Sequence, residues 1–197
     1  MKIIEQIRNK FNYLFLKSIK PQTIGGFRNP NGLFFERSSV SNMTHISNKN
    51  NNLFIGENVF VGHFNYIDGY NAKVTISNNV QITNYVNILT HSSHHSIRLI
   101  DSRFDGYAEY PEILKIGDVF IGENSYIGPH SVIMPGTKLG KGTIVSAFSF
   151  VNGDFPDFAI LRGQPARVIG DTRAVDKKLL EKYPELRETY YLRNEID

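Results

Sequence analysis

The chain has 197 residues, enough for one domain with a sizeable core, and its 41% hydrophobic and 21% charged residues are typical of a folded globular protein. It contains no cysteine, which excludes disulfides, a thiolate nucleophile and a cysteine-based zinc site. The net charge of the chain is +3. The first twenty residues contain five cations and one acid, a charge of +4, so the remainder carries −1, which argues against a nucleic-acid-binding body.

Residues 1–20 are predicted to form an amphipathic basic helix. Its apolar residues recur at helical spacing, namely Ile3, Ile4, Ile7, Phe11, Leu14, Phe15 and Ile19. Such a helix can pack on the body or on a neighbouring subunit, or it can lie on an anionic membrane surface. Polar residues interrupt the apolar stretch, so a signal peptide is not expected, and no segment approaches the roughly 20 apolar residues of a bilayer span. We expect a cytoplasmic protein, with peripheral contact at the inner face of the membrane as an option.

Residues 21–54 are predicted to be a connector and a degenerate first coil. Prolines and glycines make residues 21–32 rich in turns, and Val40 and Ile46 then indicate an imperfect repeat.

Residues 55–170 carry an aliphatic residue at every sixth position over long stretches. Ile55, Val61 and Ile67 keep this period, a nine-residue step follows, and Ile76, Ile82 and Ile88 resume it. The longest unbroken run is Ile121, Ile127, Ile133, Leu139, Val145 and Val151. This period fits neither a helix nor an ordinary strand, and it indicates a short strand and a corner, repeated. Three hexapeptides make a triangular coil of 18 residues, which predicts that Ile121 lies over Leu139, Ile127 over Val145 and Ile133 over Val151. Small residues four positions after most of these aliphatics are expected near the corners, and the glycines that follow an aliphatic are expected where the backbone turns.

The repeat stops between residues 92 and 114, and this interruption follows a histidine cluster, Thr90-His91-Ser92-Ser93-His94-His95. A 23-residue insertion in a compact repeat is too long to be a passive connection, so we expect it to be functional. After the last coil, residues 154–170 are predicted to be an irregular exit, and residues 171–197 a helical tail interrupted at Pro184.

The run from Ile121 to Gly140 and the closing Gly163-Gln-Pro-Ala-Arg-Val-Ile169 resemble the hexapeptide-repeat acyltransferases, in particular the galactoside and maltose O-acetyltransferase and xenobiotic acetyltransferase branch. The resemblance covers roughly residues 53–170. It implies an all-β fold, a left-handed parallel β-helix, flanked here by the N-terminal and C-terminal helices. It also implies a homotrimer that uses acetyl-CoA and a carbohydrate acceptor.

By the same resemblance, His91 is the catalytic base, because the family has a histidine that opens a similar stretch at the end of a coil. The chemistry suits an imidazole, whose reference pKa of about 6.5 leaves it competent to accept a hydroxyl proton near neutral pH. No Gly-x-Ser-x-Gly elbow suggests a serine nucleophile, so direct attack in a ternary complex is preferred to an acyl-enzyme.

The resemblance also indicates binding residues. For the acceptor we expect His63, Asn65, Asp68, Asn84, His94, Arg98 and Tyr110, with His63 standing where galactoside acetyltransferases show Asn. For coenzyme A we expect Gly128, Pro129, Ser146 and Ala147 along the pantetheine arm and Arg162 and Arg167 near the phosphates.

Three other functions remain open from the sequence. An amino-sugar N-acetyltransferase differs only in its acceptor. A zinc-dependent lyase of the γ-carbonic-anhydrase type uses histidines on this fold, but the flanking motifs of that family are not evident, so we expect no metal. A non-catalytic β-helix scaffold would not explain the His91 cluster or the long loop.

Overall fold

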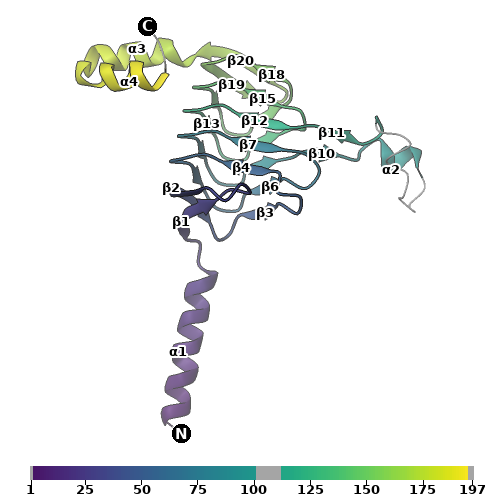
Figure 1. The fold of residues 1–197 in the computed structure, drawn as a ribbon, viewed down its shortest axis with the longest axis vertical. Coiled ribbons are helices and arrows are strands. Elements are labelled where there is room, and N and C mark those ends of the chain that lie inside the picture. The colour runs from purple at the N-terminus through teal and green to yellow at the C-terminus, as the bar shows by residue number, and fades with distance from the viewer. Residues whose placement is uncertain (1, 101–111, 195–197) are drawn as a thin grey trace.

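The computed structural model describes residues 2–100 and 112–194 as a triangular rod with a helical stem at one end and a helical hairpin at the other (Figure 1). Three parallel sheets form the sides of the rod. Sheet 1 consists of β1 (Thr23–Arg28), β2 (Phe34–Ser41), β5 (Phe60–Val61), β8 (Gln81–Ile82), β13 (Tyr126–Ile127), β16 (Ile144–Val145), β19 (Ala159–Gly163) and β20 (Ala166–Asp171), the outermost strand at each end being antiparallel. Sheet 2 consists of β4 (Leu53–Ile55), β7 (Val74–Ile76), β12 (Val119–Ile121), β15 (Lys138–Leu139) and β18 (Asp154–Phe155). Sheet 3 consists of β3 (His45–Ser47), β6 (Tyr66–Asp68), β9 (Asn87–Ile88), β14 (Val132–Ile133) and β17 (Phe150–Val151).

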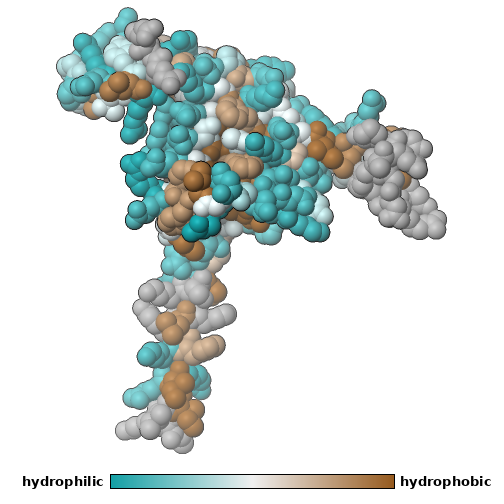
Figure 2. Space-filling model, viewed as in Figure 1, coloured by the Kyte–Doolittle hydropathy of each residue, from teal (hydrophilic) through white to brown (hydrophobic). Residues whose placement is uncertain are grey.

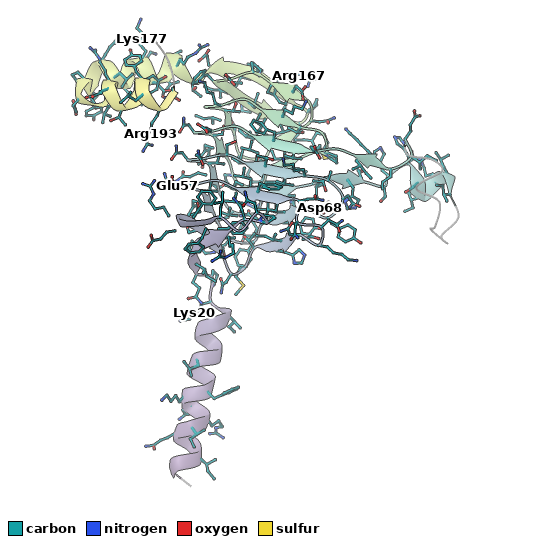
Figure 3. The ribbon with its side chains drawn as sticks, viewed as in Figure 1. Lys20, Glu57, Asp68, Arg167, Lys177 and Arg193 are labelled. Atoms are coloured by element: carbon teal, nitrogen blue, oxygen red, sulfur yellow. The ribbon has the colours of Figure 1, made fainter. Side chains whose placement is uncertain are left out.

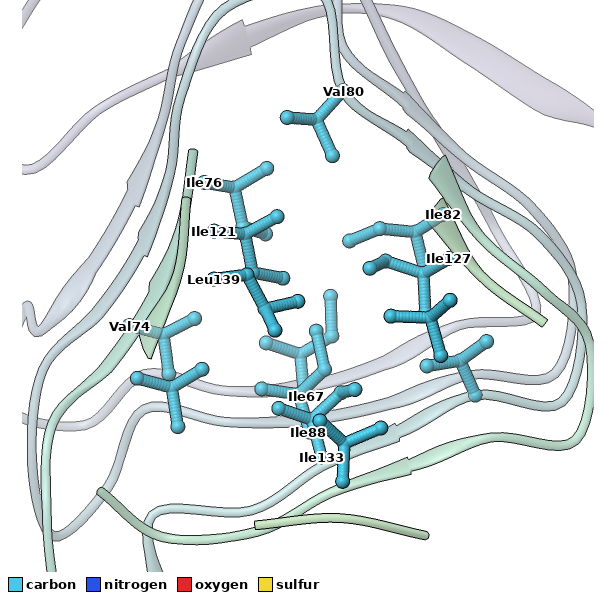
Figure 4. Packing of buried hydrophobic residues seen from close by; sticks show 14 of the residues in the cluster. Ile67, Val74, Ile76, Val80, Ile82, Ile88, Ile121, Ile127, Ile133 and Leu139 are labelled. Atoms are coloured by element: carbon cyan, nitrogen blue, oxygen red, sulfur yellow. The ribbon is translucent and has the colours of Figure 1, made fainter. Parts of the chain in front are cut away.

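The register of the coils confirms the sixfold period. Ile121 pairs with Leu139, Ile127 with Val145 and Ile133 with Val151, each on a different sheet. In the view down the rod, the aliphatic side chains of successive coils stack on one another inside the triangle, in columns that run along the rod (Figure 4). All the paired aliphatics are fully buried. The strands β4, β7 and β12 of sheet 2 each add a second buried residue, Leu53, Val74 and Val119, so the core is continuous along the rod.

Small residues occupy the corners, as the spacing predicts. The side chains of Ser125, Ser131, Thr137, Thr143 and Ser149 are buried, and each hydroxyl donates to a backbone carbonyl of the same or a neighbouring coil. A corner therefore accepts a short polar side chain because the backbone itself satisfies the hydroxyl.

The glycines that follow the aliphatics serve close packing between coils rather than an unusual backbone angle. Gly122 has no positive φ, but a Cβ at this position would lie 2.6 Å from the backbone carbon of Gly140. Gly122→Ala is therefore expected to cost about 1–3 kcal/mol of unfolding free energy, because the neighbouring coil must shift. Urea unfolding should show the loss, and Gly25→Ala is the matched control because its Cβ would meet nothing within 4 Å. A similar midpoint for both variants would contradict the close-packing explanation.

Two sequence predictions on the ends of the rod need correction. The turn-rich connector contains β1, which pairs with β2 through a bulge between Gly25 and Phe27. Its turn is fixed by Asn29, whose side-chain amide exchanges two hydrogen bonds with the backbone of Ile55. The predicted irregular exit is also ordered, because β18 and β19 continue the coils and β20 folds back on β19. The first coil at Val40 and Ile46 is confirmed by their pairing with Val61 and Ile67.

Helices flank the rod. α1 (Lys2–Ile19) extends beyond its N-terminal end, and α3 (Thr172–Lys182), a 3₁₀ turn η1 (Pro184–Leu186) and α4 (Arg187–Asn194) form the C-terminal hairpin, which confirms the break at Pro184 (Figure 1). The C-terminal end of α4 is attached to the rod, since Asn124 Nδ2 and Lys141 Nζ donate to the carbonyls of Arg193 and Asn194. Within residues 2–100 and 112–194, no helix is both long and apolar enough to cross a bilayer.

Candidate active site

The repeat is interrupted at one edge of the rod, the turn from sheet 3 to sheet 2, which we call the arm corner. There β10 (His91–Ser92) and β11 (Lys115–Ile116) pair antiparallel and leave the rod, followed on the β10 side by the short helix α2 (Ser96–Leu99) (Figure 1). Residues 101–111 of the predicted insertion lie outside the described residues. His91 lies at the base of this arm, directly after the last strand of its coil.

His91 is bonded to a buried carboxylate. Its Nδ1 lies 2.7 Å from Oδ2 of Asp68, whose side chain is 1% exposed while that of His91 is 37% exposed. Asp68 also accepts hydrogen bonds from the Thr90 hydroxyl and from the Tyr70 backbone N–H. Asp68 precedes His91 by 23 residues and reaches it because it ends β6, the strand below β9 in sheet 3.

The surroundings keep Asp68 ionised. Burial by itself would raise the pKa of its carboxyl, but the hydrogen bonds from His91, Tyr70 and Thr90 together hold that pKa below its ordinary value. A carboxylate only accepts hydrogen bonds, so the proton between the two side chains belongs to His91 Nδ1. Nε2 is then left with its lone pair, which is the arrangement a general base needs.

Asp68 therefore contacts His91 and not an open surface, which differs from its predicted place among acceptor-binding residues. Asn65 also differs, because its buried amide is satisfied by the backbone: it donates to the carbonyls of Gly62 and Thr83 and accepts from the N–H of Val86. Both side chains are turned into the rod, so neither offers a polar atom to a ligand in this chain.

His63 and Asn84 lie at a second edge, the turn from sheet 1 to sheet 3, which we call the ladder corner. Asn84 Oδ1 accepts the backbone N–H of His63, whose Nδ1 lies 2.6 Å from the hydroxyl oxygen of Ser41. Sequence reasoning missed Ser41, which is separated from His63 by 22 residues.

Four exposed rings stack along the ladder corner. Phe64, Tyr85, His130 and Phe148 lie 4.7–5.2 Å apart in nearly parallel planes, and all four residues have positive φ. The signal for this column was available in the sequence, because His130 and Phe148 are separated by one coil of 18 residues. Such stacked rings stabilise the outer surface of the corner.

Three of the four residues predicted along the pantetheine arm reach the surface of the ladder corner. Ala147 is exposed, and Pro129 and Ser146 are half-buried. Gly128 is buried, and a Cβ there would lie 2.6 Å from the backbone nitrogen of Ala147, so its lack of a side chain serves coil packing and not ligand approach.

Arg162 and Arg167 form a second feature that the sequence did not reveal as a pair. They are exposed and directly opposite each other on the hairpin of β19 and β20, at the C-terminal end of the rod. Like charges directly opposite on paired strands are unfavourable, so this pair is suited to an anionic ligand that spans both guanidinium groups. Figure 3 shows Arg167 at this end of the rod and Asp68 nearer the stem.

The remaining predicted residues lie on the arm or outside the described residues. His94 and His95 rings are 4.0 Å apart, and Arg98 donates to the His94 carbonyl and lies 3.0 Å from His95 Nδ1. Partial loss of hydration and the nearby charges of His95, Arg98 and Lys115 hold the pKa of His94 below its ordinary value. Tyr110 lies outside the described residues. Among the residues that are described, no three His, Cys, Asp or Glu side chains gather as around a metal ion.

Comparison with known proteins places this site in a family. A model of the bacterial transferase hexapeptide (six repeats) matches residues 118–153. Protein CapG of Staphylococcus aureus is 33% identical over 123 residues, which cover 62% of this chain and 67% of CapG. Galactoside O-acetyltransferase of Escherichia coli strain K12 is 34% identical over 106 residues, 53% of this chain and 47% of that enzyme. A solved galactoside acetyltransferase in complex with coenzyme A is similar with a TM-score of 0.55 and 27% identity, over 68% of this chain and 62% of that one.

The chain therefore belongs to the hexapeptide-repeat transferase family, which confirms the resemblance stated from its motifs. The alignments span 38–67% of the length of the first three curated relatives.

Proposed function

We propose that this protein is an acetyl-CoA-dependent O-acetyltransferase that acetylates a sugar hydroxyl with His91 as general base, on coils that wind left-handed as in its family. The observation that carries the proposal is the His91–Asp68 pair, which presents Nε2 of an oriented imidazole at the base of the arm. Acetyltransferases among the relatives supply the reaction class.

The reaction balances without a covalent enzyme intermediate. His91 Nε2 accepts the hydroxyl proton of the acceptor while the hydroxyl oxygen attacks the thioester carbonyl carbon. Backbone N–H groups stabilise the tetrahedral oxyanion. When the C–S bond breaks, coenzyme A leaves as a thiolate that takes the proton from the imidazolium, which restores the base.

A complete site of this kind needs more than one rod. Within one chain, His91 lies at the arm corner, whereas His63, Asn84 and Ala147 lie at the ladder corner, on the other edge of sheet 3. A homotrimer, as the family implies, can bring the arm corner of one rod against the ladder corner of the next. Coenzyme A and the acceptor would then meet between adjacent rods.

For the acceptor we propose a hydroxyl of a cell-surface glycan, such as capsule or lipopolysaccharide, modified in the cytoplasm before export. The support is the similarity to CapG and to a galactoside O-acetyltransferase, together with the exposed polar side chains of His94 and Arg98 on the arm beside His91. An amino-sugar acceptor would use the same base.

The direct test is acetyl transfer to a panel of sugars, amino sugars and polysaccharides, with free thiol and a mass gain of one acetyl group as readouts. Mild alkali removes an O-acetyl group and leaves an N-acetyl group, so the product distinguishes the two acceptors. The absence both of acetyl transfer across the panel and of coenzyme A binding by calorimetry would contradict the proposal, and stoichiometric zinc by elemental analysis would favour the lyase instead.

Replacing Arg167 tests the donor site separately. Arg167→Gln is expected to raise the KM for acetyl-CoA about tenfold and to leave kcat little changed, because a charge-assisted hydrogen bond to a phosphate is lost. Arg162→Gln should act in the same direction. Lys138→Gln, which removes an exposed cation from sheet 2, is the matched control, and an equal KM in all four proteins would show that the arginine pair does not bind the donor.

A further inference from the structure

The N-terminal helix has an exposed apolar stripe that the rod does not cover. α1 extends away from the rod, and brown apolar atoms follow its length (Figures 1 and 2). The side chains of Ile4, Ile7, Phe11 and Leu14 are 74%, 65%, 68% and 54% exposed. Large apolar side chains that recur on one face of a helix indicate a surface that something else covers.

The stripe is narrow and is bordered by cations. At about 100° of rotation per residue, its four side chains fall within an arc of roughly 80°. By the same rotation, Arg8 falls beyond one edge of the stripe and Lys10 beyond the other, while Asn9 falls on the opposite face. Cations at both borders of an apolar stripe suit an interface in which the aliphatic stems contact apolar material and the charges stay in water.

The described hydrogen bonds between the stem and the rod lie where α1 ends and the chain enters β1. Asn42 donates from its side chain to the carbonyl of Lys20 and from its backbone to the carbonyl of Gln22, where the chain enters β1. Figure 3 shows Lys20 at this junction. The stem is thus fixed at one end, and its stripe is presented beyond the rod.

We propose that α1 docks the protein on an anionic lipid surface, with the stripe in the boundary between headgroups and acyl chains. The charge of the segment selects this occupant: its five cations and one acid complement a negative surface. A helical bundle formed by copies of this chain would place the cations of neighbouring helices close together along the contact. A coiled coil balances such cations with acidic residues, and this segment has only one acid. Docking is independent of acetyl transfer and goes beyond the proposed function.

The test is sedimentation of the full-length protein with vesicles of phosphatidylcholine, with and without phosphatidylglycerol. Sedimentation is expected only with the anionic vesicles and should fall as salt is raised, because salt screens the attraction. The double variant Ile7→Gln and Phe11→Gln removes half of the exposed stripe and should partition at least about tenfold less. The control exchanges two polar residues away from the stripe, Gln6→Asn and Asn9→Gln, and should sediment as the wild type does.

Two results would overturn the proposal. The first is wild-type sedimentation that does not depend on phosphatidylglycerol or that the stripe variant retains. The second is a loss of oligomeric state by the folded stripe variant in lipid-free solution, measured by light scattering, because it would show that a second copy of the chain covers the stripe.

Discussion

His91→Ala is expected to lower the rate of acetyl transfer by about 10²- to 10⁴-fold, the range that a positioned general base contributes. In the proposed mechanism the acceptor hydroxyl loses its proton as it attacks the thioester, and the oriented Nε2 of His91 accepts that proton. The loss should appear in kcat and kcat/KM together, because the interaction develops as the proton moves. Initial rates at saturating acetyl-CoA measure it, with coenzyme A release followed through its free thiol.

The matched control is His94→Ala, which removes an exposed imidazole from the same arm. His94→Ala should lower kcat far less than His91→Ala does. Among the hydrogen bonds described, His94 bonds to Ser92 and not to Asp68, the distance from His94 Nδ1 to Ser92 Oγ being 2.8 Å. A coenzyme A dissociation constant that is unchanged in both variants would show that the donor site is intact. Equal turnover by wild type and a well-folded His91→Ala variant would refute the proposed mechanism.

The rod was predictable because its repeat ties sequence position to register. Once Ile121 and Leu139 are known to be 18 residues apart in a triangular coil, their pairing follows without further information, and the structure has that pairing. Glycine positions were predicted correctly but explained incorrectly. The spacing could not distinguish a residue that turns from one, such as Gly122, that must let a neighbouring backbone approach.

The site was less accessible to sequence reasoning because its decisive contacts join residues on different coils. Asp68 carried no motif of its own, and the nine-residue step from Ile67 to Ile76 changes the offset between β6 and β9 from 18 to 21 residues, which hid its position below His91. The arginine pair was hidden for a similar reason, because the hairpin that sets Arg162 opposite Arg167 lies where the periodicity had already ended. The resemblance therefore named His91, Asp68, Arg162 and Arg167 singly, but it did not reveal the two pairs that folding makes of them.

The arm and the rod have separate duties in the proposed enzyme. The rod supplies rigid strand ends that fix Asp68 and the base of β10, so that the imidazole is held by a buried bond. The arm carries exposed polar groups such as His94 and Arg98, which can change without disturbing the core.

Asp68→Asn is expected to lower kcat by about 10²- to 10⁴-fold although Asp68 does not touch the substrate, because it acts through His91 as a positioning residue. The amide of Asn matches the carboxylate in size but has only one acceptor oxygen. Asp68 uses both of its carboxylate oxygens to accept hydrogen bonds from His91, Thr90 and Tyr70. The NH₂ group of the introduced amide would face the N–H or O–H donors that now bond the carboxylate. Where it faces His91, it would favour the imidazole tautomer that carries its proton on Nε2. The KM for acetyl-CoA should stay unchanged, which separates positioning from donor binding.

A second readout is the pH dependence of stability, which reports the ionised state of Asp68. Folding lowers the pKa of the Asp68 carboxyl, so its ionised form stabilises the native state at every pH above the ordinary pKa of about 3.9. This contribution is lost as the pH falls through the lower pKa of the folded state. Wild type should therefore exceed Asp68→Asn in unfolding free energy at neutral pH, with the gap closing in acid. Thr90→Ser, which keeps the hydroxyl donor, is the control, and an unchanged kcat in a well-folded Asp68→Asn variant would refute the positioning role.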